Sequence, residues 1–152
     1  MRLFYDEQYW TQVNDGDERA FEIFKRHYTF RKWRCRNGKN GKRMAGPGET
    51  IVLLGKDHKA LFIWKKQKYS QDGQTGINCA VFRNENKELL SSDLLDQAEK
   101  IALNRWPGER LFTYVNARKI ESTNPGYCFK ANGWRQCGIS KARKLIILEK
   151  II

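Results

Sequence analysis

Residues Ser122–Trp134 read STNPGYCFKANGW, a segment with a clear boundary at each end. The turn-forming residues Asn-Pro-Gly at 124–126 precede a short run of aromatic and basic residues. The run stops at Asn-Gly, 132–133, a pair that commonly follows the last turn of a helix. The pattern predicts a short helix, and the neighbouring segments must indicate which fold contains it.

Regular elements flank this segment. Ser91-Ser92-Asp93 opens the run LLDQAEKIALNRW, whose apolar residues repeat at helical spacing until Pro107-Gly108. We therefore expect a helix with a serine N-cap and a Pro-Gly stop. LFTYV (111–115) predicts a strand between this helix and the short one, and KLIILEKII (144–152) closes the chain as a β-rich run.

The N-terminal half adds one helix and several strands. Apolar spacing predicts an amphipathic helix in DGDERAFEIFKRHY (15–28), with acidic residues in its first turn. β-rich runs predict a short strand, a hairpin and a third sheet strand: MRLFY (1–5), TIVLLG (50–55) with ALFIWKK (60–66), and INCAVFR (77–83). This order indicates an α+β (mixed α/β) fold, with a central mixed sheet flanked by helices in a single domain over 1–152.

The composition indicates a polyanionic partner. The chain has 152 residues and 17.9 kDa, enough for one ordinary core. Its 29 Lys and Arg against 17 Asp and Glu give a net charge of +12 and a pI of about 9.7. Such an excess favours phosphate-bearing partners, although charge alone does not distinguish DNA, RNA and ribosomes.

The cysteines and the apolar runs exclude several classes. The four cysteines are far apart and form no C-x-x-C pair, so neither a zinc knuckle nor a disulfide framework is indicated. The N-terminus lacks the apolar core of a signal peptide, and no run approaches ~18 apolar residues. We expect a soluble cytoplasmic protein with reduced thiols and no membrane segment.

Residues 30–48, FRKWRCRNGKNGKRMAGPG, form a basic loop without a sustained apolar period. It is either a solvated charged surface or a nucleic-acid contact in which cations neutralise phosphate and an aromatic ring stacks on a base. The second interpretation assigns nucleic-acid binding to Arg31, Trp33, Arg34, Arg36, Lys39, Lys42 and Arg43.

The order of elements resembles the Gcn5-related N-acetyltransferase (GNAT) fold, and the segment at 122–134 occupies the place of that fold's short helix. Members often carry an Asn or Ser, an aromatic, and a Gly followed by an aromatic around this helix. The comparable residues here are Ser122, Asn124, Phe129, Gly133 and Trp134. The resemblance implies an acyl-CoA donor, acetyl-CoA or a related thioester.

The sequence departs from the GNAT pattern at two places. FRNENKELLSSD lacks the glycines of the usual pyrophosphate loop, so donor phosphates would have to meet the helix N-terminus, with help from Arg83, Lys87, Ser91 and Ser92. Phe129 stands where many members have the Tyr that protonates the departing thiolate. Tyr127 is nearby, but two positions turn a side chain by about 160 to 200 degrees on a helix.

Several short sequence motifs indicate a narrower group within this fold. His27-Tyr28, the GPG-containing loop, VFRNE (81–85), and YVN followed by STNPGYCF resemble the divergent GNAT-fold phage proteins of the Mom group, which modify adenine bases in DNA. The resemblance implies DNA as partner, the cytoplasm of a bacterial host, and iron as a metal associated with that group. Two histidines, His27 and His58, provide no ligand set by spacing.

Five residues are candidates for chemistry: His27, Tyr28, Ser122, Asn124 and Tyr127. His27 is either a structural histidine on an apolar stripe or a general base or metal ligand. Ser122 and Asn124 either belong to a turn or present polar groups to an acyl oxygen or a base edge. Tyr127 is the alternative acid.

Two classes of function remain open at this stage. The first is a GNAT-fold transferase that modifies an amino group on nucleic acid, with an ordinary protein or small-amine N-acetyltransferase as the other enzymatic version. The second is a non-catalytic nucleic-acid-binding module on the same fold, which the missing glycine loop and Phe129 favour.

Overall fold

The computed structural model describes residues 9–27, 44–45, 48–67, 73–118, 126–141 and 143–151. The predicted strand at 1–5 and nearly all of the basic loop lie outside these ranges.

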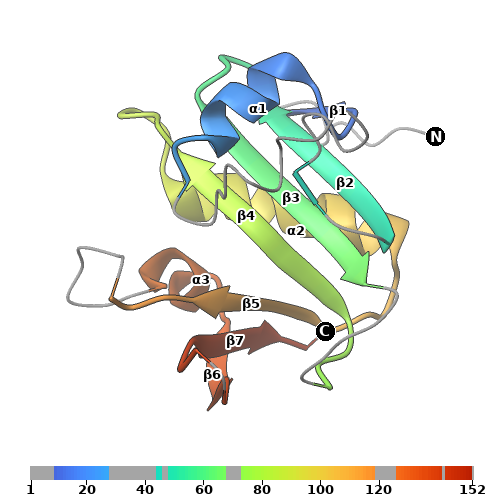
Figure 1. Ribbon diagram of the computed structural model, residues 1–152, viewed down its shortest axis with the longest axis vertical. Coiled ribbons are helices and arrows are strands. Elements are labelled where there is room, and N and C mark those ends of the chain that lie inside the picture. Colours follow the sequence, from blue (N-terminus) through green and yellow to red (C-terminus); the bar gives the residue numbers. More distant parts are fainter. Residues whose placement is uncertain are drawn as a thin grey trace.

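A seven-stranded mixed sheet with three helices forms the structure, in the order β1-β2-β3-β4-β5-β7-β6 (Figure 1). Neighbouring strands are antiparallel except β4 and β5, which are parallel. The elements are β1 Trp10–Val13, α1 Glu18–Phe24, β2 Gly48–Gly55, β3 Ala60–Gln67, β4 Ile77–Asn84, α2 Ser91–Arg105, β5 Leu111–Val115, α3 Tyr127–Ala131, β6 Arg135–Ile139 and β7 Ile146–Lys150. The predicted α+β class, a central mixed sheet flanked by helices, is confirmed.

Each face of the sheet has its own core. Alternation along β3 directs Phe62 and Trp64 toward α2, and Leu61 and Ile63 toward α1. Two buried tryptophans also fasten α2 to the sheet by hydrogen bonds. The indole N–H of Trp64 donates to the carbonyl of Ala98 at 2.8 Å, and that of Trp10 donates to the carbonyl of Leu94 at 2.9 Å.

Two sequence predictions about helix ends were wrong. The N-cap position of α2 is Leu90, which makes no side-chain cap bond, and Ser91 is the first helical residue. The Ser91 hydroxyl instead accepts a hydrogen bond from Asn84 Nδ2 at 3.1 Å. The first helix ends at Phe24 rather than continuing to 28, because His27 N bonds to Phe24 O in a tighter turn. The Pro-Gly stop after α2 is confirmed.

Two strands were not predicted. β1 and β6 are the two edges of the sheet, and each has five residues or fewer. β6, RQCGI, is mostly exposed and contains Gly138, so it has neither apolar alternation nor strong strand propensity. Pairing with β7 forms it, an interaction that a local reading of the sequence does not reveal.

Glu99 fixes α3 and the C-terminal strands against α2. This carboxylate is 3% exposed and accepts hydrogen bonds from Trp134 Nε1 at 2.9 Å and from Asn132 Nδ2 at 3.3 Å. Lys150 Nζ pairs with its other oxygen at 2.6 Å. Asn132 Nδ2 also donates to the carbonyl of Ser92 at 3.0 Å, so the end of α3 is tied to the start of α2.

We predict that Glu99→Gln lowers the free energy of unfolding by about 2 to 4 kcal/mol, because the substitution leaves Lys150 without its buried carboxylate and places a donor against another donor. Asp96→Asn on the exposed side of the same helix is the matched control. It removes an exposed pair with Lys100 and should cost less than about 0.5 kcal/mol. Urea unfolding measures both, and equal losses would contradict the role of Glu99.

Candidate active site

Strands β4 and β5 separate partway along their length (Figure 1). Their parallel pairing covers Ile77↔Leu111 to Cys79↔Thr113 and ends there. At the same point β4 contains a bulge: Trp64 faces Cys79 and Ile63 faces Val81, so Ala80 is an extra residue. A bulge bends its strand, and here it coincides with the point of divergence.

The divergence exposes one edge of β4. β3 pairs with one edge of β4, but beyond Cys79 the other edge has no strand partner in the described chain. Backbone N–H and C=O groups on that edge can therefore bind a ligand. The hydroxyl of Thr113 donates to the carbonyl of Cys79 at 3.0 Å, and this bond reinforces the last residue pair that joins β4 to β5.

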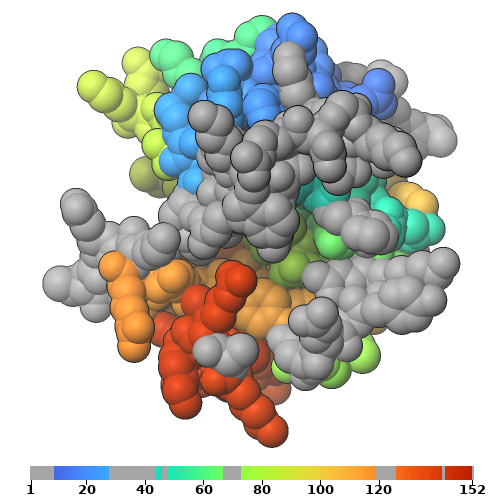
Figure 2. All heavy atoms as spheres, viewed as in Figure 1, coloured from blue at the N-terminus to red at the C-terminus, as the bar shows by residue number. Residues whose placement is uncertain are grey.

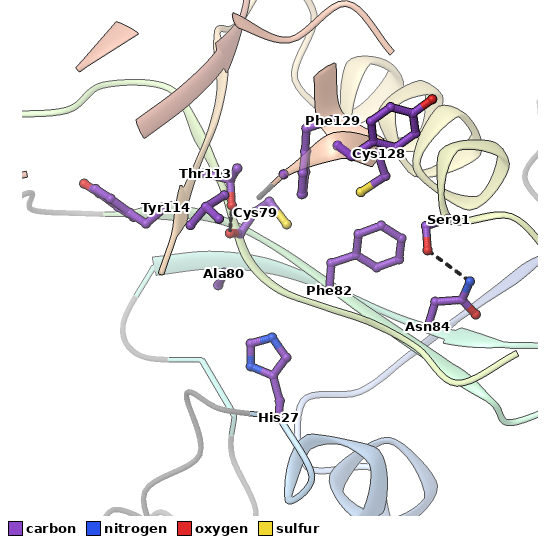
Figure 3. Close-up of a pocket in the computed structure, with 13 residues that line it drawn as sticks. His27, Cys79, Ala80, Phe82, Asn84, Ser91, Thr113, Tyr114, Cys128 and Phe129 are labelled. Atoms are coloured by element: carbon purple, nitrogen blue, oxygen red, sulfur yellow. Dashed lines mark hydrogen bonds between the residues drawn. The ribbon is translucent and has the colours of Figure 1, made fainter. Parts of the chain in front are cut away.

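A cavity of about 260 Å³ lies in this divergence, and we call it the cleft pocket. Figure 3 shows His27 on the α1 side of β4, with Cys128 and Phe129 on the opposite side. Its lining residues are His27, Cys79, Ala80, Phe82, Asn84, Ser91, Thr113, Tyr114, Val115, Gly126, Tyr127, Cys128 and Phe129.

His27 is buried and neutral in the pocket wall. His27 lies three residues after the end of α1, and its ring hydrogen-bonds to the backbone of Phe82. Burial, and then the nearby Arg83, lower the pKa of His27 to about 4, against the smaller opposite effect of the Phe82 bond. His27 is therefore uncharged at pH 7.

Arg83, the charged residue that lowers the pKa of His27, belongs to an ion cluster. Glu85 pairs with both Arg26 and Arg83 at 2.6 Å, and its pKa is lowered to about 2 chiefly by the bond from Arg26. Arg83 lies opposite Leu61 in the sheet, on the α1 side. It is thus engaged on the face away from α2, and its predicted contact with donor phosphates would require another arrangement of this cluster.

The loop between β4 and α2 has a defined shape without glycine. Asn84 Nδ2 donates to the carbonyl of Leu89 at 2.9 Å, and Asn84 Oδ1 accepts from the Asn86 amide at 2.9 Å. No residue between 85 and 90 has a positive φ, so the loop does not need glycine. It delivers Ser91 and Ser92 to the first turn of α2, where backbone amides lack helical acceptors. Lys87 is exposed on this loop.

The described part of the segment at 122–134 forms the floor of the pocket. Gly126 precedes α3 with φ 77, and a Cβ there would lie 2.6 Å from Leu148 Cδ1, so this position requires glycine. Phe129 is 7% exposed, and its ring lies 4.9 Å from that of Trp134 and 6.1 Å from that of Phe82. Tyr127 lines the pocket and is 65% exposed.

The pocket thiols are poor nucleophiles. Burial raises the pKa of Cys128 to about 11 and raises that of Cys79 further. Both are protonated at neutral pH, so neither supplies a thiolate.

Some of the predicted site residues line the pocket. His27, Ser91 and Tyr127 line the pocket together, although they are far apart in sequence. Tyr28, Ser122, Asn124 and the seven residues assigned to the basic loop lie outside the described residues, and their roles stay predictions. Asn84, Thr113 and Phe82 were missed. A polar residue at the end of a strand was the available signal for Asn84, whereas the bulge that exposes the others has no local signature.

Two further expectations bear on the site. The described residues contain no group of three or more His, Cys, Asp or Glu side chains that could hold a metal ion, so iron has no ligand set among them. Among the helices described, none is long and apolar enough to cross a membrane.

The architecture corresponds to a known acyltransferase fold. No family model and no curated protein matches the sequence. The crystal structure of an acyl-CoA N-acyltransferase from Pseudomonas aeruginosa is similar over 93% of this chain and 98% of that chain, with a TM-score of 0.59 and 12% sequence identity. The chain therefore has a GNAT-like fold, and at this identity the likeness is one of fold.

We predict a loss of stability in acid that depends on His27. Because the folded state disfavours the imidazolium, the unfolded state takes up the proton first as the pH falls. This contribution is zero well above pH 6.5 and reaches on the order of 3 kcal/mol of destabilisation near pH 4. Urea unfolding of wild type and His27→Gln at pH 7.5 and 4.5 should show a smaller pH effect in the variant. His58→Gln, at an exposed turn, is the control and should behave as wild type.

Proposed function

We propose that this protein is a GNAT-fold transferase that moves an acyl-type group, or a group derived from it, from an acyl-CoA-type donor to an amino group on nucleic acid. Modification of adenine in DNA, as in the Mom group, is the specific version. The observation that carries the proposal is the cleft pocket, where an unpaired strand edge lies beside the N-terminus of α2.

The residues present fit such a donor. An acyl-CoA brings a thioester whose carbonyl an amine can attack. The free edge of β4 after Cys79 offers backbone groups to the amide-containing arm of the donor, as a neighbouring strand would. The first amides of α2 and the Ser91 and Ser92 hydroxyls offer donors and a positive dipole to its phosphates.

The pocket also suits a neutral amine. Its described lining contains no carboxylate, and His27 is uncharged at neutral pH, so no fixed charge in this lining favours an ammonium ion over the amine. With its ring bonded to Phe82, His27 is better suited to orienting the acceptor than to acting as a base with a pKa of about 4.

One observation supports the alternative of a binding module without catalysis. The place of the usual acid is taken by Phe129, a core residue that also contacts Trp134. The nearby hydroxyl belongs to the exposed Tyr127. An ordinary protein or small-amine acetyltransferase remains the other enzymatic version, since the fold alone does not select the acceptor.

Calorimetry with acetyl-CoA tests the donor site. Wild type should bind, and Ser92→Glu should weaken binding at least tenfold, because a carboxylate at the N-terminus of α2 repels the donor phosphates. A glutamate there is favourable for the helix itself, so the fold should persist. Ser92→Ala is the control and should bind within a few-fold of wild type. No binding by wild type at millimolar ligand would refute both enzymatic versions.

Mass spectrometry of nucleosides then tests the acceptor. DNA exposed to the protein and acetyl-CoA should yield an adduct on an amino-bearing base, whereas modified peptide or polyamine with unchanged DNA would favour the ordinary acetyltransferase.

Tyr127→Phe tests the acid. The substitution keeps the ring and removes the hydroxyl, so we expect a roughly 10- to 1,000-fold lower turnover with donor affinity unchanged. Tyr9→Phe, outside the pocket lining, is the control. Wild-type turnover in the Tyr127 variant would exclude Tyr127 as the acid.

A further inference from the structure

The positive charge of this chain is concentrated in two segments. Residues 30–48 contain seven Lys and Arg and no acidic residue, a net +7. Residues 111–148 contain seven Lys and Arg and one acidic residue, Glu121, a net +6. The rest of the chain carries 12 − 7 − 6 = −1. Half of the net charge therefore lies in the C-terminal part of the fold, outside the basic loop already assigned to nucleic acid.

Only some of these C-terminal cations have partners. At the base of the β6–β7 hairpin, Glu149 pairs with Arg110 at 2.7 Å and with Arg135 at 2.9 Å. At the opposite end, the exposed residues Lys141, Arg143 and Lys144 pair with none of the carboxylates that the structure describes. We call the turn Ser140–Leu145 the hairpin tip.

The hairpin tip is a closed turn. Ser140 N donates to Leu145 O at 2.8 Å, Lys144 N donates to Ser140 O at 3.1 Å, and Leu145 N donates to Ser140 Oγ at 3.0 Å. Lys144 has a φ of 57, a left-handed conformation that these bonds maintain. These bonds join Ser140 to Lys144 and Leu145, so the two ends of the turn are held together without a partner, which lowers the entropy lost on binding.

The tip adjoins the open end of the cleft pocket. β7 begins at Ile146, which pairs with Ile139 on one side and with the pocket residue Val115 on the other. Arg118 lies three residues beyond Val115. It is exposed, it forms no ion pair with a carboxylate of the described chain, and its backbone amide donates to Asn116 Oδ1 at 3.1 Å. The C-terminal hairpin, red in Figure 2, projects at the lower edge of the molecule.

We propose that the hairpin tip and Arg118 bind the phosphate backbone of the nucleic acid whose base enters the cleft pocket. This inference rests on the proposed function, because it assigns the second contact of the same substrate. A regularly charged polymer matches two separate basic segments, one of which continues from the pocket residue His27 and the other from the pocket residue Val115. A small anion would not need charges spread over both the hairpin tip and Arg118.

The test is a triple substitution, Lys141→Gln, Arg143→Gln and Lys144→Gln. The control is Lys56→Gln, Lys59→Gln and Lys100→Gln, three exposed lysines whose loss changes the net charge by the same amount. Binding of both variants and wild type to a labelled DNA duplex and single strand is measured by fluorescence anisotropy across salt concentrations.

We expect the tip variant to bind DNA at least tenfold more weakly at low salt. Its slope of log affinity against log salt should fall by roughly 0.9 per lost phosphate contact on duplex, or roughly 0.7 on single strand. The control should lose less than about threefold. Circular dichroism and acetyl-CoA calorimetry should match wild type in both variants, since the tip lies outside the donor site.

The outcomes separate this inference from the proposed function. DNA binding by wild type with equal losses in tip variant and control would overturn the tip while leaving a nucleic-acid substrate in place. Loss of binding to phosphatidylglycerol vesicles without loss of DNA binding would assign the tip to a membrane surface and overturn the inference. A tip-dependent affinity with no nucleoside adduct would support the surface and refute the chemistry.

Discussion

The divergence of β4 from β5 is the constraint on which the rest of this structure depends. A parallel pair normally continues until one strand ends, but here the extra residue Ala80 and the end of pairing at Cys79 occur together. Unpaired backbone groups inside a sheet cost free energy unless a ligand or water satisfies them. Such an opening persists because the surrounding structure holds it, and the contacts on both sides of the opening do so.

The closed end of the divergence is held by Arg110. Its guanidinium donates to Glu149, to the carbonyl of Thr75 and to Gln74, while its own carbonyl accepts from Ile77 N at 2.7 Å. On the α2 side, Glu99 joins α2 to α3 and β7 through hydrogen bonds and an ion pair, and Asn132 also donates to the carbonyl of Ser92 at the start of α2. Strands β5, β7 and β6 therefore stay attached to the larger half of the sheet although only three residue pairs join β4 to β5.

Local sequence patterns specified most elements but not the site. The strand-like run ALFIWKK and the helical spacing of apolar residues in LLDQAEKIALNRW are local patterns, so β3 and α2 could be predicted from these segments alone. β1 and β6 exist because a neighbouring strand pairs with them, and the N-cap of α2 was misassigned because Asn84, outside the helix, uses the Ser91 hydroxyl. His27 and Tyr127 were identified by residue type. Their shared pocket depends on the bulge at Ala80, which arises from the mismatch of two strands rather than from either sequence alone.

The charged residues of the described chain fall into two groups, those that form ion pairs within the fold and those that are exposed without such a pair. The buried or half-buried carboxylates Glu85, Glu99 and Glu149 are each engaged by basic side chains that hold the fold. These three carboxylates therefore form ion pairs that hold the elements of the fold together. The described lining of the pocket contains no carboxylate. Three exposed cations that pair with none of the described carboxylates, Lys141, Arg143 and Lys144, lie at the hairpin tip, beyond the last paired residues of β5 and β7. The proposed nucleic-acid substrate is consistent with this division, because a positively charged border attracts a polyanion and a lining without carboxylates imposes no charge on the group that enters it.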